Sequence, residues 1–425
     1  MNRRLFLGQS AALFGTSLGI NKLALASAPS KAQVVVVGAG YGGATAAKYI
    51  RMLSNNSIGV TVIEPNENFI SCPLSNLVVG GEEKIGALTT PYSGLSNNHG
   101  IEMIRDMVSK IDTAKKTVTT KGGITIQYDK LVLAPGITMN MGSVEGLAQA
   151  NAAGVTLQAW KAGPETVALH KQIADMPDGG VVALTVPLAP YRCPPGPYER
   201  TCQIANYLKN NKPKSKIIVL DANADVTSKG KLFKKAWADM YKGYVDYRPA
   251  HKVVGVNAKT KTLKFEFEED LKADVLNVIP VMGAGSLVVD TGLANMNNRW
   301  AEVNFLNFES TQAKDVHIVG DSIQVAPRMP KSGHMANQQA KVAAAAIVSE
   351  LKGFPVNPNP VVTNTCYSFV NDREVVHVAS VHQYDAVKKT FLTVPGSGGL
   401  SPEPSQIEGI YAWAWAKNIW NDTVG

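Results

Sequence analysis

Four cysteines are the residues of this chain whose types and spacing favour sulfur chemistry: Cys72, Cys193, Cys202 and Cys366. Cysteine serves as a nucleophile, a metal ligand or half of a disulfide, and spacing helps to separate these roles. None of the four stands in a close pair of the kind that binds zinc, and no Cys-x-x-Cys-His segment exists. The sequence therefore predicts no metal site and no attached haem, and it leaves three possible pairings for two disulfides.

The first elements predicted to position these sulfurs are a strand, a glycine-rich turn and a helix near the start of the chain. Residues 33–37 are a valine-rich run, followed by a G-x-G-x-x-G sequence at Gly38, Gly40 and Gly43 and then by an alanine-rich segment. A second predicted strand ends at Glu64, 21 positions after Gly43. In a βαβ unit of this spacing, the helix N-terminus faces a pyrophosphate and the acidic residue binds the ribose hydroxyls.

Two later segments point to FAD as the nucleotide. Residues 128–136, with Ala134 and Gly136, resemble the strand-and-glycine signature of flavoproteins that have two dinucleotide-binding domains. Residues 316–321, which end in Gly320 and Asp321, resemble the late motif of those flavoproteins, whose aspartate contacts the flavin ribityl chain. The resemblance implies bound FAD and an α/β fold of two Rossmann-like domains, similar to glutathione reductase, with a C-terminal interface domain.

The second nucleotide-binding unit lacks the glycine fingerprint. Residues 180–186 and 216–221 are predicted to be its first two strands, but the intervening turn at 187–197 contains five prolines. Proline has no backbone N–H for a pyrophosphate, and its ring fills space that the backbone must leave open. We therefore expect this unit to keep the fold and to lose the nicotinamide site.

Four short segments, three of them around cysteines, carry a more specific resemblance. They read Ser-Cys-Pro-Leu-Ser-Asn at 71–76, Arg-Cys-Pro-Pro-Gly-Pro-Tyr-Glu-Arg at 192–200, Pro-Lys-Ser-Gly at 330–333 and Asn-Thr-Cys-Tyr-Ser at 364–368. Together they resemble the flavoprotein subunit of flavocytochrome c sulfide dehydrogenase. The similarity extends from about residue 33 to the end of the chain.

This resemblance implies a flavin that is covalently attached through Cys72, by a thioether to the 8α-methyl carbon. Cys72 lies shortly after Glu64, on the loop that follows the strand expected to meet the FAD ribose. A free buried cysteine is the alternative. The remaining cofactor residues implied by the resemblance are Lys331, Ser332 and Gly333, next to a helix start at His334 whose amides would face the flavin pyrimidine.

The resemblance also implies that Cys193 and Cys366 form a redox pair beside the flavin. Sulfide attack on their disulfide would give a persulfide and a thiolate, and Glu199 would take the proton. Two alternatives remain open for the cysteines: a purely structural bridge, or a bridge from Cys193 to Cys202, which is otherwise a buried helical thiol. Glu199 could instead form an ion pair with Arg200 or another base.

The first 28 residues are interpreted as an export signal. Arg3 and Arg4 precede an apolar run over residues 5–20, which is typical of a twin-arginine signal, although an ordinary secretory signal is the alternative. The run is shorter than the roughly 20 residues that a membrane span needs, so no transmembrane anchor is expected. Export to the periplasm would permit at least one disulfide.

The predicted domains follow from these segments. The C-terminal aromatic residues Tyr411, Trp413 and Trp415 have period-two spacing, which favours an interface strand or a packed terminal segment. The predicted limits are 1–28 for the signal, 29–145 and 285–355 for the two halves of the FAD domain, 146–284 for the NAD-binding-like domain and 356–425 for the C-terminal interface domain.

The expected function is sulfide oxidation in the periplasm, with electrons passing from the cysteine pair through FAD to a c-type cytochrome on a separate subunit. Alternatives are an accessory flavoprotein of a thiosulfate-oxidising system, a sulfide:quinone oxidoreductase and a noncatalytic subunit that carries flavin. The formal net charge of +8 falls to +5 without the signal, and the basic residues form no stripe, so no nucleic-acid partner is expected.

Overall fold

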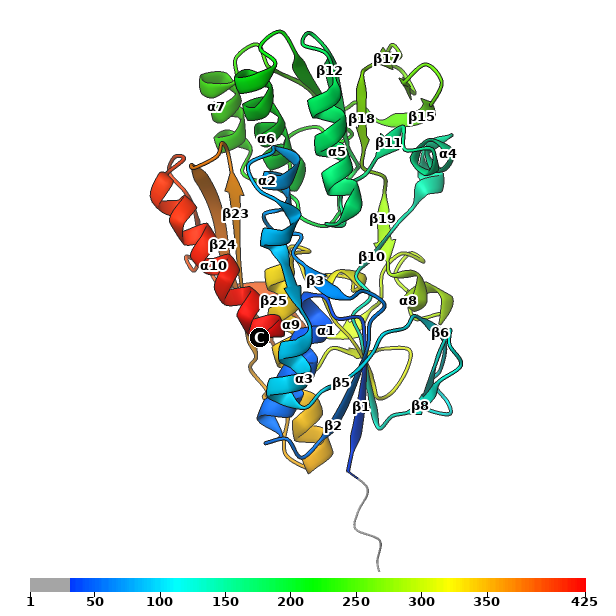
Figure 1. The fold of residues 1–425 in the computed structure, drawn as a ribbon. Coiled ribbons are helices and arrows are strands. Elements are labelled where there is room, and N and C mark those ends of the chain that lie inside the picture. The colour runs from blue at the N-terminus through cyan, green and yellow to red at the C-terminus, as the bar shows by residue number, and fades with distance from the viewer. Residues whose placement is uncertain (1–30) are drawn as a thin grey trace, which may run out of the picture. The chain divides into compact units, whose positions relative to one another are not determined.

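Two largely parallel sheets flanked by helices organise residues 31–425, the part of the chain that the computed structural model describes (Figure 1). The predicted export signal at 1–28 lies outside the described residues. The predicted α/β fold with two Rossmann-like units is confirmed by these sheets. Contacts join Ala32–Gly425 into one unit, and the predicted domain limits within it stay a prediction.

The first sheet has seven strands that come from two separated parts of the chain. Its strand β1 is almost wholly apolar and buried, as expected for a parallel strand covered on both faces. In sheet order the strands are β20 (Val303–Asn304), β21 (Glu309–Ser310), β22 (Val316–Ile318), β9 (Lys130–Leu133), β1 (Gln33–Val37), β2 (Gly59–Ile63) and β5 (Glu102–Ile104).

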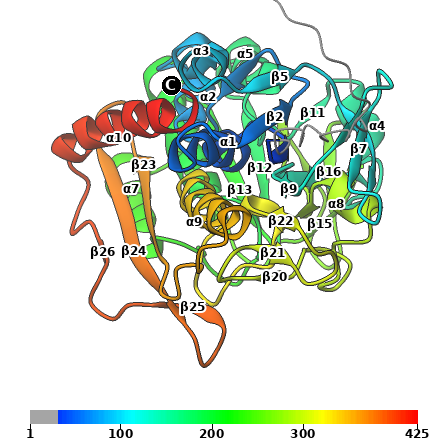
Figure 2. The same ribbon diagram turned by 90° about the horizontal axis from the view of Figure 1, so that it is seen from below.

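Two helices pack side by side on one face of this sheet, α1 (Tyr41–Leu53) and α9 (Gly333–Lys352) (Figure 2). Close backbone packing explains the glycine fingerprint before and within α1. Gly38 has a φ of +89°, and a Cβ there would lie 2.6 Å from the carbonyl oxygen of Ala134. A Cβ on Gly43 would lie 1.8 Å from the carbonyl oxygen of Gly38, so α1 reaches this position only with glycine.

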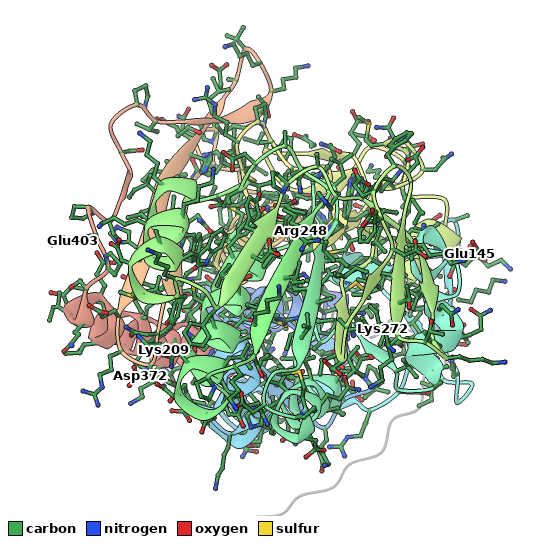
Figure 3. The ribbon with its side chains drawn as sticks, turned by 90° about the horizontal axis from the view of Figure 1, so that it is seen from above. Glu145, Lys209, Arg248, Lys272, Asp372 and Glu403 are labelled. Atoms are coloured by element: carbon green, nitrogen blue, oxygen red, sulfur yellow. The ribbon has the colours of Figure 1, made fainter. Side chains whose placement is uncertain are left out.

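The second sheet is formed by the segment inserted between the two parts of the first. Arg248 ends its edge strand, and Lys272 lies in a neighbouring small sheet (Figure 3). In sheet order the strands are β11 (Thr156–Leu157), β18 (Val275–Val278), β12 (Val181–Val186), β13 (Lys216–Asp221) and β14 (Val245–Arg248), and the helices are α5 (Pro164–Asp175), α6 (Gly196–Asn211) and α7 (Gly230–Met240). The chain enters and leaves the insert through the antiparallel pair β10 (Ile137–Met139) and β19 (Met282–Ala284).

The C-terminal segment forms an antiparallel sheet of β23 (Val361–Phe369), β24 (Val375–Asp385), β25 (Thr390–Thr393) and β26 (Gly399–Leu400), followed by α10 (Gln406–Val424). Of the two predictions for the aromatic end, the interface strand was wrong, because Tyr411, Trp413 and Trp415 all lie on α10. The packed terminal segment is what the structure shows, in helical form. The buried residues of α10 include Ala412, Ala416 and Trp420, at helical spacing. The alternating pattern misled because the intervening alanines are good helix formers.

Smaller elements complete the described part of the chain, and no helix in it is both long and apolar enough to span a membrane. They are α2 (Ser75–Val79), α3 (Ser93–His99), α4 (Leu147–Ala152), α8 (Ser286–Asp290), η1 (Ile85–Leu88), η2 (Met141–Ser143), η3 (Gly320–Ser322), β3 (Asn68–Ile70), β4 (Thr89–Pro91), β6 (Val108–Asp112), β7 (Thr117–Thr120), β8 (Thr125–Gln127), β15 (Val253–Asn257), β16 (Thr262–Phe265) and β17 (Leu271–Lys272).

The close approach of α1 to the turn before it makes Gly43→Ala a test of the fold. The added methyl group would meet backbone, which cannot rotate away, so the clash should outweigh the better helix propensity of alanine. We expect a loss of unfolding free energy on the order of 3 kcal/mol, measured by guanidinium unfolding with circular dichroism. Gly86→Ala is the control, since a Cβ there meets nothing within 4 Å. Equal midpoints for both variants would contradict this packing.

Candidate active site

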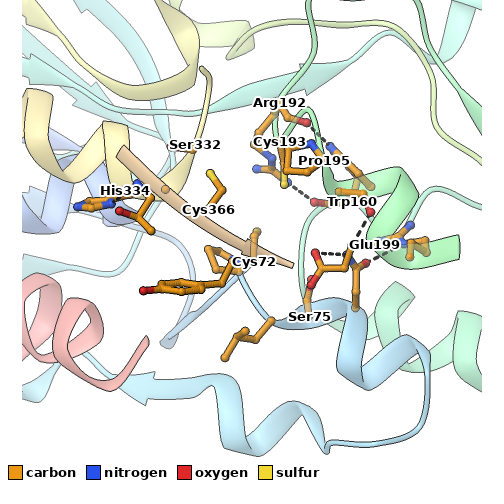
Figure 4. Close-up of a pocket in the computed structure, with 18 of the residues that line it drawn as sticks. Cys72, Ser75, Trp160, Arg192, Cys193, Pro195, Glu199, Ser332, His334 and Cys366 are labelled. Atoms are coloured by element: carbon orange, nitrogen blue, oxygen red, sulfur yellow. Dashed lines mark hydrogen bonds between the residues drawn. The ribbon is translucent and has the colours of Figure 1, made fainter. Parts of the chain in front are cut away.

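Cys193, Cys366 and Glu199 line a single cavity, which we call the sulfur cavity (Figure 4). The three residues come from the loop after β12, from β23 and from the first turn of α6. Cys72 lines the same cavity from the loop before α2. The structure thus brings together the predicted redox cysteines, the predicted acid and the predicted flavin-bearing cysteine.

Cys193 is held by its backbone. Its N–H donates to the carbonyl oxygen of Lys331 at 2.8 Å, and its own carbonyl accepts from the N–H of Gly196 at 2.9 Å. Its φ of +59° lies in the left-handed region, which costs a non-glycine residue on the order of 1 kcal/mol. Burial raises the pKa of the Cys193 thiol, and the neighbouring Cys366 and Glu199 add to that rise.

Cys366 lies in β23, where paired backbone on β24 fixes its position. Asn364 Nδ2 lies 3.4 Å from the Cys366 sulfur and donates to it. Ser332, the N-cap of α9, donates to Asn364 Oδ1 at 2.6 Å and accepts from the N–H of Met335. Burial raises the pKa of Cys366, whereas the ammonium of Lys229 and the Asn364 hydrogen bond lower it.

Cys202 lies apart from the sulfur cavity. It is fully buried in the middle of α6, and its sulfur accepts from Nε1 of Trp237 at 3.3 Å. All four cysteines are free thiols in the structure, so the disulfide between Cys193 and Cys366 stays a prediction. The environment of Cys202 is that of the buried helical thiol that the sequence suggested, rather than of a partner for Cys193.

Glu199 is buried beside both redox cysteines and is held by neutral donors. Its carboxylate accepts from the N–H of Phe369 at 3.0 Å and from Asn76 Nδ2 at 3.0 Å. Arg200 makes no hydrogen bond to Glu199. Instead it donates to Asn76, Asn277 and backbone carbonyls, so the predicted alternative of an ion pair with Arg200 is wrong. Burial raises the pKa of Glu199, which makes it a better proton acceptor than an exposed carboxylate.

A second cavity, here called the flavin cavity, adjoins the first. Cys72 and Gly333 line both cavities. The other predicted cofactor residues that line the flavin cavity are Gly38, Gly40, Glu64, Ala134, Gly136, Gly320 and Asp321. Gly43 does not line it, since its role is the close packing of α1 described above.

The residues of the flavin cavity fit FAD. Its glycines leave the backbone open at the N-terminus of α1, where a pyrophosphate binds. Glu64 directly follows β2, and its carboxylate already accepts from the N–H of Ala39 at 2.7 Å. Asp321 Oδ1 is buried with no hydrogen-bond partner among the described residues. A buried polar oxygen without a partner is costly, and a ligand hydroxyl such as that of a ribityl chain would satisfy it.

Two residues expected at the cofactor site occupy other positions. Lys331 lines neither cavity. Its Nζ donates to the carbonyl oxygens of Asp321 and Ile323 and lies 3.6 Å from the ring centroid of Trp300. Ser332 lines the sulfur cavity and not the flavin cavity. In this structure Lys331 braces the loop that carries Asp321, and Ser332 caps α9.

Four residues in or next to the site were missed by sequence reasoning. Trp160 and Asn76 line the sulfur cavity, and Arg192 lines both cavities. Lys229 lies behind the cysteines and is buried. Asn76 and Arg192 fall within the cysteine-bearing segments and could have been found there, whereas Trp160 and Lys229 stand in segments with no recognisable pattern.

The N-terminus of α6 shows why a nicotinamide dinucleotide does not suit the second unit. A Cβ on Gly196 would meet the Trp160 ring at 2.7 Å and the Cys193 sulfur at 2.9 Å, so these side chains cover the first turn. Pro195 and Pro197 flank that glycine and offer no N–H. The position that binds a pyrophosphate in a Rossmann unit is therefore occupied by the loop that carries Cys193 and by the Trp160 ring.

Three family models match successive parts of the chain. The pyridine nucleotide-disulphide oxidoreductase model matches residues 32–165, the central model of the sulfide dehydrogenase (flavocytochrome c) flavoprotein chain matches 166–280, and the flavocytochrome c sulphide dehydrogenase flavin-binding model matches 358–424. The chain is 56% identical over 46 residues to the sulfide dehydrogenase (flavocytochrome c) flavoprotein chain of Chlorobaculum thiosulfatiphilum, which is 11% of this chain and 94% of that sequence.

Sulfide:quinone oxidoreductases are also similar. The mitochondrial protein of Dictyostelium discoideum is 25% identical over 339 residues, which cover 76% of this chain and 72% of that protein. The X-ray structure of the Aquifex aeolicus enzyme superposes with a TM-score of 0.73 at 20% identity, over 92% of this chain and 91% of that one. The second likeness concerns the fold alone.

The fold and the two cavities define a flavoprotein of the pyridine nucleotide-disulfide oxidoreductase class. Within that class, the chain belongs to the family of sulfide dehydrogenase (flavocytochrome c) flavoprotein chains, as its cysteine segments predicted. The family and the flavin-binding match indicate FAD as the cofactor and sulfide as the substrate of a flavin-dependent oxidoreductase.

NADH and NADPH should fail to reduce the flavin at useful rates, because Trp160, Cys193 and the prolines occupy the first turn of α6. The measurement is anaerobic stopped-flow absorbance of the flavin after mixing with either nucleotide. Sulfide in the same apparatus is the positive control. Rapid bleaching by NADH would contradict our reading of the second unit.

Proposed function

We propose that this protein is the flavoprotein of a periplasmic sulfide dehydrogenase, which oxidises sulfide at a Cys193–Cys366 disulfide and passes electrons through covalent FAD to a c-type cytochrome. The observation that carries this proposal is the sulfur cavity, where two cysteines and a buried carboxylate meet beside the flavin cavity. A structural disulfide alone would need neither Glu199 nor a cavity open to a small substrate.

The chain's own residues account for the first step. Hydrosulfide forms a bond to one sulfur of the disulfide, the bond between Cys193 and Cys366 breaks, and the other sulfur leaves with the electron pair as a thiolate. Glu199 holds the proton released by hydrogen sulfide or by the persulfide. Its carboxylate is a stronger base than an exposed one, because burial raises its pKa. Bound FAD supplies an acceptor for the two electrons that the sulfur pair gains from sulfide.

Cys72 supports a covalent cofactor by its position. It borders both cavities, and the loop that carries it starts where β3 ends, a few residues beyond Glu64. A thiol at the junction of a flavin site and a sulfur site is placed to anchor the ring end of the cofactor. Export of a protein with such an attached cofactor agrees with the twin-arginine signal inferred from the sequence.

The electron acceptor has two candidates. The family of this chain pairs a flavoprotein with a cytochrome, which supports a c-type cytochrome on a separate subunit. The relatives that align over most of the chain are named for quinone, which is the specific observation in favour of a quinone acceptor. Sulfide-driven reduction of cytochrome c against that of a soluble quinone separates the two. Faster turnover with quinone would overturn the cytochrome assignment.

A thioether at Cys72 predicts that flavin stays with the protein after denaturation. Acid precipitation of the wild type should leave the yellow colour in the pellet, whereas Cys72→Ser should release its flavin into the supernatant. Flavin absorbance of the two fractions is the measurement. Cys202→Ser is the matched cysteine control and should retain flavin as the wild type does. Full release from a wild type with complete flavin content would show that the bond is absent.

Cys193→Ser and Cys366→Ser should each abolish sulfide-driven bleaching of the flavin while FAD stays bound. Both sulfurs are required, since one forms the bond to sulfide and the other leaves. Loss of one disulfide typically costs about 2 to 4 kcal/mol, which a chain with large cores tolerates. Cys202→Ser should bleach at nearly the wild-type rate, measured by anaerobic stopped flow. If Cys366→Ser is bleached by sulfide as fast as the wild type and Cys202→Ser is not bleached, the redox pair is not Cys193 and Cys366.

A further inference from the structure

Lys229 is a buried ammonium directly behind the sulfur cavity. It is the N-cap residue of α7 in the left-handed region, with a φ of +57°, and it is 6% exposed. All three of its N–H donors are used, by the carbonyl oxygen of Cys366 at 2.9 Å, Ser368 Oγ at 2.8 Å and the carbonyl oxygen of Val376 at 3.0 Å. These acceptors lie on the paired strands β23 and β24, one of them on Cys366 itself.

The acceptors of Lys229 are all neutral. Within residues 31–425 the ammonium makes no salt bridge, although removing a charge from water is expensive unless an opposite charge compensates it. Burial lowers the pKa of Lys229 to about 8, and the groups that oppose this shift are led by Cys366, followed by Glu199 and Cys193. The negative charge that compensates Lys229 must therefore come from these groups of the sulfur cavity.

The two cysteines differ in how well they can carry that counter-charge. Cys366 has Lys229 behind it, a hydrogen bond to its sulfur from Asn364 and the N-terminus of the 20-residue helix α9 nearby through Ser332. Cys193 receives no side-chain hydrogen bond to its sulfur among the described residues. Its sulfur and the Trp160 ring both lie against Gly196. Arg192 is the cation that lowers the pKa of Cys193 most, ahead of Lys229, whereas Lys229 comes first for Cys366.

We propose that Lys229 is a positioning residue that makes Cys366, rather than Cys193, the sulfur that holds the thiolate when the disulfide opens. This inference rests on the proposed function. Hydrosulfide then bonds to Cys193, the Cys193–Cys366 bond breaks, and Cys366 keeps the electron pair. One negative charge enters with hydrosulfide and one remains on Cys366, next to the ammonium, so the step consumes no other reactant.

The other ionisable groups around Cys366 do not supply this charge. Glu199 on α6 and Cys193 face it and would repel a thiolate. His334 on α9 accepts the N–H of Thr365, and burial lowers its pKa, which favours the neutral ring. Glu408 on α10 raises the pKa of Lys229 and, as an acid, supplies no positive charge to Cys366. Lys229 is thus the cation that lowers the pKa of Cys366 most.

The test is alkylation of the reduced holoprotein with iodoacetamide over a pH series, with peptides containing Cys366 and Cys193 quantified by mass spectrometry. Lys229→Met should move the Cys366 profile upward by about one pH unit, which is about a tenfold slower alkylation below its midpoint. Cys193 should move less. Lys229→Arg keeps the charge and should stay near the wild-type profile. Lys235→Met is the control on the exposed side of α7, where Lys235 pairs with Asp239.

Lys229→Gln is the second neutral variant, since its amide can still donate to two of the acceptors without the charge. An unshifted Cys366 profile in either folded neutral variant, or a larger shift at Cys193, would overturn the proposal. So would unfolding of both neutral variants while Lys229→Arg folds with the wild-type profile, because that pattern assigns Lys229 a structural role only.

This experiment is independent of the proposed function, because alkylation requires no sulfide. If the Cys366 profile shifts but sulfide does not bleach the flavin, the role of Lys229 stands and the assignment of sulfide as substrate is wrong. If sulfide bleaches the flavin normally but the Cys366 profile does not shift, the sulfide assignment stands and the role of Lys229 is wrong.

Discussion

The attachment of β23 to the inserted domain is the constraint on which the site depends. Cys366 and Cys193 are far apart in the chain and meet only because β23 is held against α6 and α7 by polar contacts across that boundary. Lys229 donates to the carbonyl oxygen of Cys366, Glu199 accepts from the N–H of Phe369, and Gln203 donates to the carbonyl oxygen of Phe369. Each contact places a charged or polar side chain in a buried position, so a shift of β23 would leave it unpaired.

The same contacts set the electrostatics of the sulfur cavity. The groups that tether the strand are also ionisable, since Glu199 has a carboxyl group and Lys229 an ammonium group, and the proposed sulfur reaction uses both charges. Burial moves the pKa of Glu199 upward and that of Lys229 downward, to about 8. A low local dielectric strengthens every charge–charge effect on the cysteines. Structural and chemical roles are therefore difficult to separate by deletion alone, and variants that keep the charge are informative.

The inserted domain illustrates how a nucleotide-binding unit can be kept for its shape. Its five-stranded sheet and α6 retain the Rossmann arrangement. The turn that would bind a pyrophosphate instead presents a cysteine, with prolines that restrict the backbone and Trp160 packed against Gly196. A rigid loop at the helix N-terminus suits a sulfur atom that must meet a strand from another part of the chain. This arrangement agrees with the proposal that a small sulfur substrate, rather than a dinucleotide, reacts at Cys193.

The sequence by itself determined the fold class, the FAD fingerprint and the family, because these depend on local patterns: glycines that a close approach requires, valine-rich strands and cysteines inside short motifs. It also indicated that Glu199 belongs with the cysteines. Only the tertiary structure decided that Arg200 and Glu199 both bond to Asn76 rather than to each other, that Lys331 braces a loop, that the aromatic end is a helix and that Lys229 lies behind Cys366. Those outcomes depend on partners that are distant in the chain, such as Asn76 for Arg200, and the packing that selects such partners leaves no periodic signal in the sequence.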